Sequence, residues 1–402
     1  MGGKYVEENK WWVSPYNFFD EVRADFNLPN KVEIHDATLR DGEQTPGVVF
    51  RKEHKVEIAQ MLDEVGIERI EAGMPAVAEE DFAAIKEISK LGLKAKIYAF
   101  ARAATVDIDK AVDCGAHGVV IEIPIGYPKL KFQFGWTWED VARKSVDCIS
   151  YAKRKNLHVV YFPYDTTRAR DEDLTNVLTR ITRDSPPDSV GVVDTTGCAL
   201  PEAIKYMVRK VKKITKLPVE IHTHNDFGMG VATELAAVTA GAEVVHGCVN
   251  GLGERTGNAA VEELMVGLHL LLGFETQYKL DRIGQLCQLV RDLSGIQPAG
   301  NKPVIGEGNY TRESGIGVDL VMKNPLAMFA TAPQLFGREG KVVLGKKSGK
   351  ASITYTLEKL GIKNASEDAV AEILKEVKAM GTAKRALLSM DEFREIVSRR
   401  IK

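Results

Sequence analysis

Short apolar segments and amphipathic segments alternate along the chain from residue 31 to about residue 248. Eight apolar, β-rich segments predict strands, at 31–36, 67–72, 94–100, 118–123, 157–162, 189–194, 219–223 and 243–248. Between them, apolar residues recur every three or four positions and predict helices at 51–65, 78–91, 138–155, 171–183, 201–216 and 228–240. Several predicted strands are nearly continuous apolar runs, which is typical of a parallel sheet covered on both faces.

Eight strand–helix units of this size favour an α/β fold of the (β/α)8 TIM-barrel type. A doubly wound open sheet is the alternative, but no GxGxxG turn follows the first strand, which argues against a dinucleotide-binding version. After about residue 275 the pattern changes to predicted helices separated by loops rich in glycine and proline, at 280–294, 322–332, 365–381 and 390–401. We therefore expect an N-terminal arm at 1–30, a TIM-barrel catalytic domain at 31–278 and a mainly helical C-terminal subdomain at 279–402.

The composition narrows the class of protein. The formal net charge is −2, with Lys+Arg 54 against Asp+Glu 56, which gives no support for a nucleic-acid or anionic-membrane partner. No apolar run approaches the roughly 18–20 residues that a membrane span needs. The chain has 5 cysteines, which are scattered along it without CxxC pairs. This distribution fits reduced thiols in a cytoplasmic protein.

Two predicted strand ends carry residues suited to a metal site, and barrel reactions take place at these ends. Asp41, after the first strand, could ligate a divalent cation, and Arg40 beside it could hold a developing negative oxygen; a surface ion-pair cluster is the alternative. His222 and His224, two apart at the end of the seventh strand, point to the same side. With Asp41 they form a two-histidine, one-carboxylate set that leaves coordination positions open for a substrate.

Two further strand ends offer substrate-binding groups. The loop NGLGERTGN at 250–258 provides Glu254 as an acid or base and Asn258 as a carbonyl ligand, although a plain glycine-rich turn is the alternative. Thr195, after the sixth strand, could bind a substrate carboxylate through its hydroxyl or could simply cap the next helix.

Together the stretches HDATLRDGEQTPG, HTHNDFGMG and NGLGERTGNA resemble the signatures of the DRE-TIM metallolyase family, in the same order along the chain. The last of these resembles the acyl-CoA condensing branch, which comprises isopropylmalate, homocitrate, citramalate and Re-citrate synthases. The lyase branch carries a cysteine in the corresponding loop, and none is present here. The segments NKPVIGEGNYTRESGIG and LGKKSGKAS are similar to the helical subdomain of the synthases.

The resemblance implies a divalent-metal-dependent Claisen condensation of acetyl-CoA, or a related acyl-CoA, with a 2-oxo acid. Thioester hydrolysis would then release CoA and a 2-hydroxy-2-alkyl dicarboxylate or tricarboxylate. Asp41, His222 and His224 would bind Mg²⁺, Mn²⁺ or Zn²⁺, with Asn258 as a further ligand.

The same resemblance assigns the other pocket residues. Arg40 would polarise the keto oxygen, Thr195 would hold the carboxylate of the oxo acid, and Gln44 and Asp165 would line the pocket. Glu254 would belong to the acid/base machinery. Selectivity for the oxo acid would depend on side chains near 74–75, 98 and 123.

Several departures from the family leave the general base open. Arg312 and Gly317 stand where the synthases usually have two histidines, so Tyr310, Glu313 or a residue elsewhere would take over the proton transfer. We therefore expect a divergent 2-oxo acid substrate. A metal-dependent C–C lyase or aldolase of the same superfamily is the alternative, and a barrel with a merely structural metal site is a third.

The resemblance also implies a homodimer in which the helical region covers the barrel mouth of the partner. The expected partners are therefore small molecules and a second copy of the chain. The segment that follows the barrel includes no regulatory domain of the kind that many isopropylmalate synthases append, so we expect no feedback inhibition by leucine.

Overall fold

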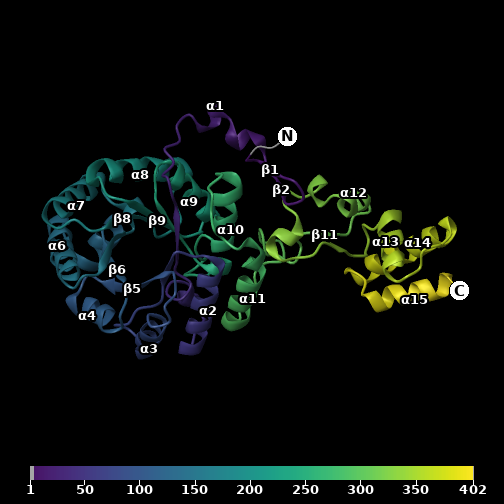
Figure 1. The fold of residues 1–402 in the computed structure, drawn as a ribbon, viewed down its shortest axis with the longest axis horizontal. Helices are drawn as coiled ribbons and strands as arrows, with labels where there is room; N and C mark the ends of the chain where they lie inside the picture. The colour runs from purple at the N-terminus through teal and green to yellow at the C-terminus, as the bar shows by residue number, and fades with distance from the viewer. Residues whose placement is uncertain (1–3, 402) are drawn as a thin grey trace. The chain divides into compact units, whose positions relative to one another are not determined.

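The computed structural model describes residues 4–401 and divides into two compact units (Figure 1). The larger unit is Pro15–Pro298. The other combines the chain before Pro15 with the chain from Ala299 onward. The N-terminal arm expected at 1–30 is thus shared between the units, and the transition after the barrel lies about 20 residues beyond the expected position at 278.

The larger unit is a closed barrel of parallel strands in the order β10-β3-β4-β5-β6-β7-β8-β9. Its strands are β3 Glu33–Asp36, β4 Arg69–Glu71, β5 Lys96–Arg102, β6 Gly118–Pro124, β7 His158–Tyr164, β8 Ser189–Asp194, β9 Val219–Thr223 and β10 Val244–Gly247. β10 pairs with both β9 and β3, which closes the sheet and excludes the open doubly wound alternative. The TIM-barrel prediction is confirmed.

Helices surround the barrel, as Figure 1 shows. They are α1 Asp20–Arg23, α2 Lys52–Val65, α3 Glu79–Ile88, α4 Thr105–Asp113, α5 Tyr127–Lys129, α6 Trp138–Arg154, α7 Asp171–Asp184, α8 Pro201–Thr215, α9 Gly230–Thr239, α10 Val261–Val266 and α11 Ile283–Ser294. α6 illustrates why they form: Thr137 and Asp140 cap its first turn, and Val141, Ser145 and Ile149 repeat every fourth residue on its buried face.

The barrel interior has two chemically different halves. Side chains of β5–β8 form an apolar cluster of Tyr98, Phe100, Val120, Val160, Phe162 and Val193. The strands on the other side contribute a polar ladder, which we define as the buried side chains of His35, Glu71, Glu220 and His246 together with the partly buried Arg69.

Each charged side chain of the polar ladder forms an ion pair or hydrogen bond with another member. His35 Nε2 lies 3.1 Å from Glu71 Oε2, His246 Nε2 lies 2.8 Å from Glu220 Oε2, and Arg69 Nη1 lies 2.8 Å from Glu220 Oε1. The rings of His35 and His246 stack with centroids 4.3 Å apart. Because an unpaired buried charge is strongly unfavourable, these residues support one another within the barrel.

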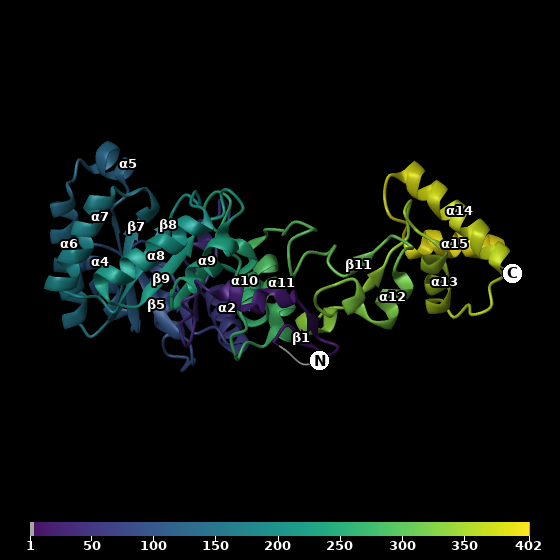
Figure 2. The same ribbon diagram turned by 90° about the horizontal axis from the view of Figure 1, so that it is seen from above.

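The C-terminal unit is built around a helical cluster. α13 Lys350–Lys359, α14 Glu367–Lys384 and α15 Met390–Arg400 lie together in Figure 2 and bury a core that includes Ile353, Ile373 and Phe393. β11 Thr311–Arg312 pairs in parallel with β12 Lys341–Val342.

The helix expected at 322–332 is wrong. α12 spans Val318–Lys323 and stops at Asn324, because Pro325 cannot donate a backbone hydrogen bond and holds the residue before it in an extended conformation. The sequence pattern also does not predict α13, which begins within a glycine-rich segment that is typical of a loop.

The N-terminal segment contributes a hairpin to this same unit. β1 Val6–Glu7 pairs antiparallel with β2 Trp11–Trp12, and the Trp12 N–H donates to Ala330 O at 2.8 Å. Among the described residues no helix is long and apolar enough to cross a membrane, and no disulfide joins any of the cysteines.

Candidate active site

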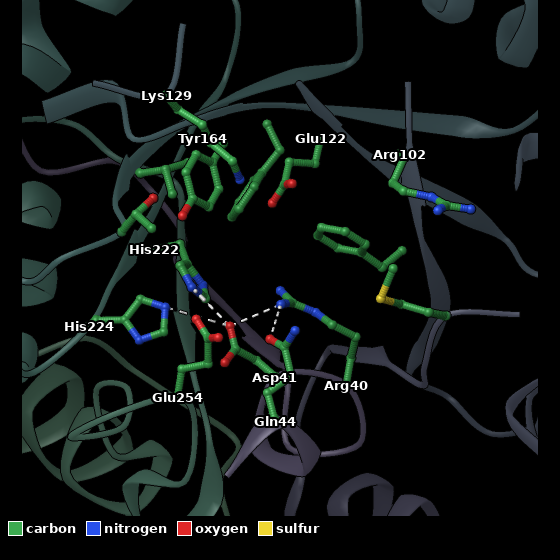
Figure 3. Close-up of a pocket in the computed structure, with 15 residues that line it drawn as sticks. Arg40, Asp41, Gln44, Arg102, Glu122, Lys129, Tyr164, His222, His224 and Glu254 are labelled. Atoms are coloured by element: carbon green, nitrogen blue, oxygen red, sulfur yellow. Dashed lines mark hydrogen bonds and ion pairs between the residues drawn. The ribbon is translucent and has the colours of Figure 1, made fainter. Parts of the chain in front are cut away.

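A cavity of about 260 Å³ lies at the carboxyl ends of the barrel strands (Figure 3). Its walls combine charged and aromatic side chains: Arg40, Asp41, Gln44, Met74, Phe100, Arg102, Glu122, Lys129, Phe162, Tyr164, Val193, Thr195, His222, His224 and Glu254. Of the residues expected to control selectivity, Met74 lines this cavity.

The loop after β3 is fixed by a buried turn. The Thr38 hydroxyl donates to Asp36 Oδ2 at 2.7 Å and accepts from the Val249 N–H at 2.8 Å. These bonds join the first strand end to the loop after β10, so Arg40 and Asp41 are held at the cavity floor. Burial raises the pKa of Asp36 to about 7, although the hydrogen bonds from Thr38 oppose the shift.

Arg40 is oriented by three side chains. Its Nε donates to Glu71 Oε1, and its Nη1 donates to Asp41 Oδ2 at 2.9 Å and to Gln44 Oε1 at 3.4 Å. The guanidinium carbon lies 4.3 Å from the centroid of the Phe100 ring. Nη2 is buried and has no hydrogen-bond partner among the described residues. Arg40 therefore presents an oriented donor that is still available to a ligand.

Asp41, His222 and His224 converge, as the sequence predicted. Their possible ligand atoms all lie within 4.8 Å of one another. Asp41 Oδ2 is 3.4 Å from His222 Nε2 and 3.7 Å from His224 Nε2. Burial lowers the pKa of His224 to about 4. For Asp41, burial would raise the pKa, but Arg40 and the two histidines hold it well below its ordinary value.

Asn258 lies beside this group, and its position depends on the absence of a side chain at two nearby glycines. It bridges to His224 through the backbone, and its Nδ2 donates to Leu252 O at 3.0 Å. A Cβ at Gly253 would lie 2.2 Å from Asn258 Nδ2 and 3.2 Å from Asp41 Oδ1. A Cβ at Gly257 would lie 1.8 Å from Gly251 O. The close approach of this loop to the site therefore requires glycine.

The donor set fits a divalent cation. Asp41 Oδ1 and Asn258 Oδ1 are both buried without a hydrogen-bond partner in the described part of the chain. Buried oxygens of this kind normally have a partner, and a cation would supply one. Two imidazoles with carboxylate and amide oxygens form a mixed nitrogen and oxygen set that Mg²⁺, Mn²⁺ and Zn²⁺ can all accept.

Thr195 and Asp165 are connected, but only Thr195 lines the cavity. The backbone N–H of Asp165 donates to Thr195 Oγ1 at 2.9 Å. The carboxylate of Asp165 binds Arg168, with Nε–Oδ1 2.8 Å, and the preceding Tyr164 faces the cavity instead. Asp165 thus positions Thr195 and is not itself among the lining residues.

Glu254 lines the cavity mouth with a half-exposed carboxylate that pairs with Arg255 Nη1 at 3.1 Å. Arg255 also donates to Thr195 O at 2.6 Å, which braces the two loops. Tyr310 belongs to the C-terminal unit, where its hydroxyl lies 2.5 Å from Thr331 Oγ1.

Sequence reasoning missed Glu71, Glu122 and Lys129. Glu71 orients Arg40, whereas Glu122 and Lys129 line the cavity. Glu122 carries a detectable signal, because it is the single carboxylate of the otherwise apolar predicted strand 118–123. Glu71 does not stand out in the same way, since its predicted strand 67–72 also contains Glu68 and Arg69. A charge inside a strand covered on both faces needs a partner or a ligand.

Comparison with known proteins agrees with this geometry. Residues 31–290 match the HMGL-like family model, which covers more than half of the chain. The chain belongs to the HMGL-like family. Residues 304–385 match the homocitrate synthase post-HMGL domain-like model, which accounts for much of the C-terminal unit.

Two relatives that match nearly the whole of this chain are named as synthases. The chain is 39% identical to homocitrate synthase AksA of Methanopyrus kandleri, over 96% of each chain. It is also 39% identical to 2-isopropylmalate synthase of Methanocaldococcus jannaschii, over 96% of this chain and 74% of that relative. These relatives confirm the acyl-CoA condensing branch of the DRE-TIM family, an acyltransferase class.

The solved structures agree on the fold. Hydroxymethylglutaryl-CoA lyase of Pseudomonas aeruginosa superposes with a TM-score of 0.60 at 18% identity, over 67% of this chain and 95% of that one.

Proposed function

We propose that this protein catalyses the divalent-metal-dependent condensation of acetyl-CoA with a 2-oxo acid, followed by hydrolysis of the thioester. One observation carries the proposal: Arg40 presents an unpaired Nη2 while its Nη1 lies 2.9 Å from a member of the Asp41, His222 and His224 cluster. The site thus combines a cation-binding group with a donor for a developing oxyanion.

The proposed chemistry places the charge that develops on the keto oxygen beside Arg40. A divalent ion held by Asp41, His222, His224 and Asn258 would supply Lewis-acid polarisation of the 2-oxo acid. Arg40 Nη2 would donate to the same oxygen as it becomes an alkoxide. Glu71 and Asp41 fix the other guanidinium nitrogens, so this donor needs no reorganisation during the reaction.

The remaining wall would bind and orient the oxo acid. We assign its carboxylate to the hydroxyl of Thr195, which lines the cavity. Gln44 would contribute its amide nitrogen, because its Oε1 already accepts from Arg40. Glu254, which lines the cavity, is the proposed acid/base residue for thioester hydrolysis. The acid/base role of Tyr310 stays a prediction from the sequence, because Tyr310 belongs to the other unit.

The test is release of CoA thiol from acetyl-CoA in the presence of pyruvate, 2-oxoisovalerate, 2-oxoglutarate, oxaloacetate or glyoxylate. Protein treated with chelator and then supplied with Mg²⁺, Mn²⁺ or Zn²⁺ identifies the metal in the same assay. We expect one oxo acid and one metal to give rapid thiol release. Absence of release with every combination, together with cleavage of a hydroxy-acyl-CoA, would instead establish the lyase alternative.

We also propose a cytoplasmic homodimer. The support is the family resemblance together with cysteines that form no disulfide in the described residues. Light scattering on the purified protein gives the mass directly, and a monomer over the working concentration range contradicts the dimer.

A further inference from the structure

Glu122 lies on the cavity wall across from the metal-binding group. It comes from β6 Gly118–Pro124, and Figure 3 shows its carboxylate directed toward the middle of the cavity, opposite Asp41. No hydrogen bond or ion pair joins this carboxylate to any residue that the structure describes. Packing alone does not account for an acid at this position, since the flanking Ile121 and Ile123 are buried in the barrel wall.

The other carboxylates of the cavity are already engaged. Asp41 accepts from Arg40 and faces His222 and His224. Glu254 pairs with Arg255 at the exposed mouth. Glu122 is therefore the one lining carboxylate, among the described residues, that is free to accept a proton from a ligand.

The surroundings of Glu122 suit a general base. Burial raises its pKa to about 7, while the positive charges of Arg40 and Lys129 oppose that rise and the negative charges of Asp41 and Glu71 add to it. Tyr164 lines the same cavity. A carboxylate whose pKa lies near the working pH can both take up and release a proton.

Lys129 provides a cation on the same wall. Its Nζ lies 3.7 Å from the centroid of the Tyr164 ring, so the ammonium is held by a cation–π contact. No salt bridge neutralises it within the described residues, and Figure 3 shows it near Glu122 and Tyr164 at the cavity. An acid and an ammonium that line one cavity can together remove a proton next to a thioester carbonyl and stabilise the negative oxygen that results.

We propose that Glu122 is the catalytic base that removes a proton from the methyl group of the acyl thioester, and that Lys129 stabilises the resulting enolate oxygen. This inference rests on the proposed condensation. It supplies the base that the sequence left open, because Arg312 and Gly317 replace the family histidines.

The proposed step balances as follows. The carboxylate of Glu122 takes one methyl proton, and the C–H electron pair becomes the carbon–carbon double bond of the enolate, with the negative charge on the oxygen beside Lys129. The enolate carbon then attacks the keto carbon of the oxo acid. The carbonyl electron pair moves to the oxygen beside Arg40, and a proton from Glu122 or water neutralises that alkoxide.

The test compares Glu122→Gln with wild type in condensation assays using acetyl-CoA and trideuterated acetyl-CoA. We expect kcat to fall about a hundredfold or more, the usual contribution of a general base. The deuterium isotope effect should rise, because proton removal becomes rate-limiting. The KM for the oxo acid and the bound metal per chain should remain unchanged. Lys129→Met should likewise lower kcat and raise the deuterium isotope effect, as Glu122→Gln does.

Two variants serve as controls. Glu68→Gln changes a partly buried carboxyl whose pKa is also raised by burial, but it precedes β4 at the other end of the barrel and should retain the wild-type kcat and isotope effect. Glu122→Asp keeps the acid on a shorter side chain and should restore part of the activity. It also provides the measurement if Glu122→Gln does not fold.

Three results would overturn the inference. A kcat of Glu122→Gln within about threefold of wild type with an unchanged isotope effect excludes a base. A higher KM for the oxo acid with unchanged kcat shows that Glu122 binds that substrate instead. If wild type condenses no oxo acid at all, the proposed function fails first, and this separates the two failures.

Discussion

Arg40 and Asp41 are neighbours in the chain, and their side chains also meet, with Arg40 Nη1 2.9 Å from Asp41 Oδ2. A proposed oxyanion donor and a proposed metal ligand thus share one hydrogen bond. Movement of either side chain disturbs the other, so binding of the cation and polarisation of the keto oxygen should respond together to mutation.

Removal of the metal should abolish condensation reversibly. His222→Ala takes away one imidazole of a cluster whose ligand atoms lie within 4.8 Å, so we expect loss of bound metal and of thiol release with the fold retained. Elemental analysis and circular dichroism provide the two readouts. Unfolding of His222→Ala, or activity that survives without metal, would indicate a structural role instead.

Glu71→Gln should slow the reaction through Arg40. Glu71 accepts from Arg40 Nε and from His35, and loss of its charge should lower kcat by about tenfold to a hundredfold, as for other groups that orient active-site residues. Breaking the buried pair should also lower the free energy of unfolding by about 3–5 kcal/mol. Steady-state kinetics and urea unfolding measure the two effects.

Glu33→Gln provides the matched control for this change. Glu33 pairs with Arg69 at the other end of the polar ladder, with Oε2–Nε 2.7 Å. We expect it to reduce stability while kcat stays near the wild-type value. An equal loss of kcat in both variants would contradict a specific effect on Arg40.

Asp36→Asn should change how stability depends on pH. Burial raises the folded-state pKa of Asp36 to about 7, so between its ordinary pKa and pH 7 the folded protein keeps a proton that the unfolded chain has lost. The contribution of Asp36 to the free energy of unfolding of wild type therefore decreases as the pH rises. Between pH 5 and pH 8 the loss is about 3 kcal/mol, which Asp36→Asn should not show.

Urea unfolding of both proteins at pH 5 and pH 8 checks this prediction. Other titrating groups are present in both proteins and cancel in the comparison. The difference in unfolding free energy should shift in favour of Asp36→Asn at the higher pH. An identical difference at both pH values would show that Asp36 is ionised in the folded protein throughout this range.

Gly257→Ala should disrupt the loop that carries Asn258. The added Cβ would lie 1.8 Å from Gly251 O, at a φ of +84 that side chains rarely adopt. We expect loss of thiol release and a lower melting temperature. Gly295→Ala is the control, since its φ of +72 is similar but no atom lies within 4 Å of the added Cβ. Similar damage in both variants would mean that backbone strain, and not the collision, is responsible.

The strand positions could be predicted because barrel strands are buried on both faces and so form short apolar runs with clear ends. The C-terminal region was harder, because its boundaries depend on local turns. Pro325 ends α12 where the apolar pattern continues, and α13 starts within the glycine-rich segment that includes Gly349. Local backbone chemistry overrides hydrophobic periodicity at both places.

The metal-binding group was predictable from spacing alone, since His222 and His224 share a strand face and Asp41 follows another strand end. Glu71 and Glu122 were not, because their roles depend on which way each strand is rotated in the barrel. That rotation follows from the pairing of neighbouring strands, such as Glu71 opposite Tyr98 and Glu122 opposite Phe162. The amino-acid sequence alone does not specify this pairing, and so does not specify the direction in which each glutamate points.

The two halves of the barrel interior should tolerate change very differently. On the β5–β8 side, replacements such as Val120→Ile or Val160→Ile alter only volume and should cost about 1–3 kcal/mol through overpacking. On the opposite side, replacing His246 alone would remove one partner of the buried Glu220 and leave Arg69 as its ion-pair partner. Substrate redesign should therefore begin from members of the apolar cluster that also line the cavity, such as Phe162 and Val193, where a single change alters the space for substrate. The polar ladder should tolerate exchange only when paired residues change together.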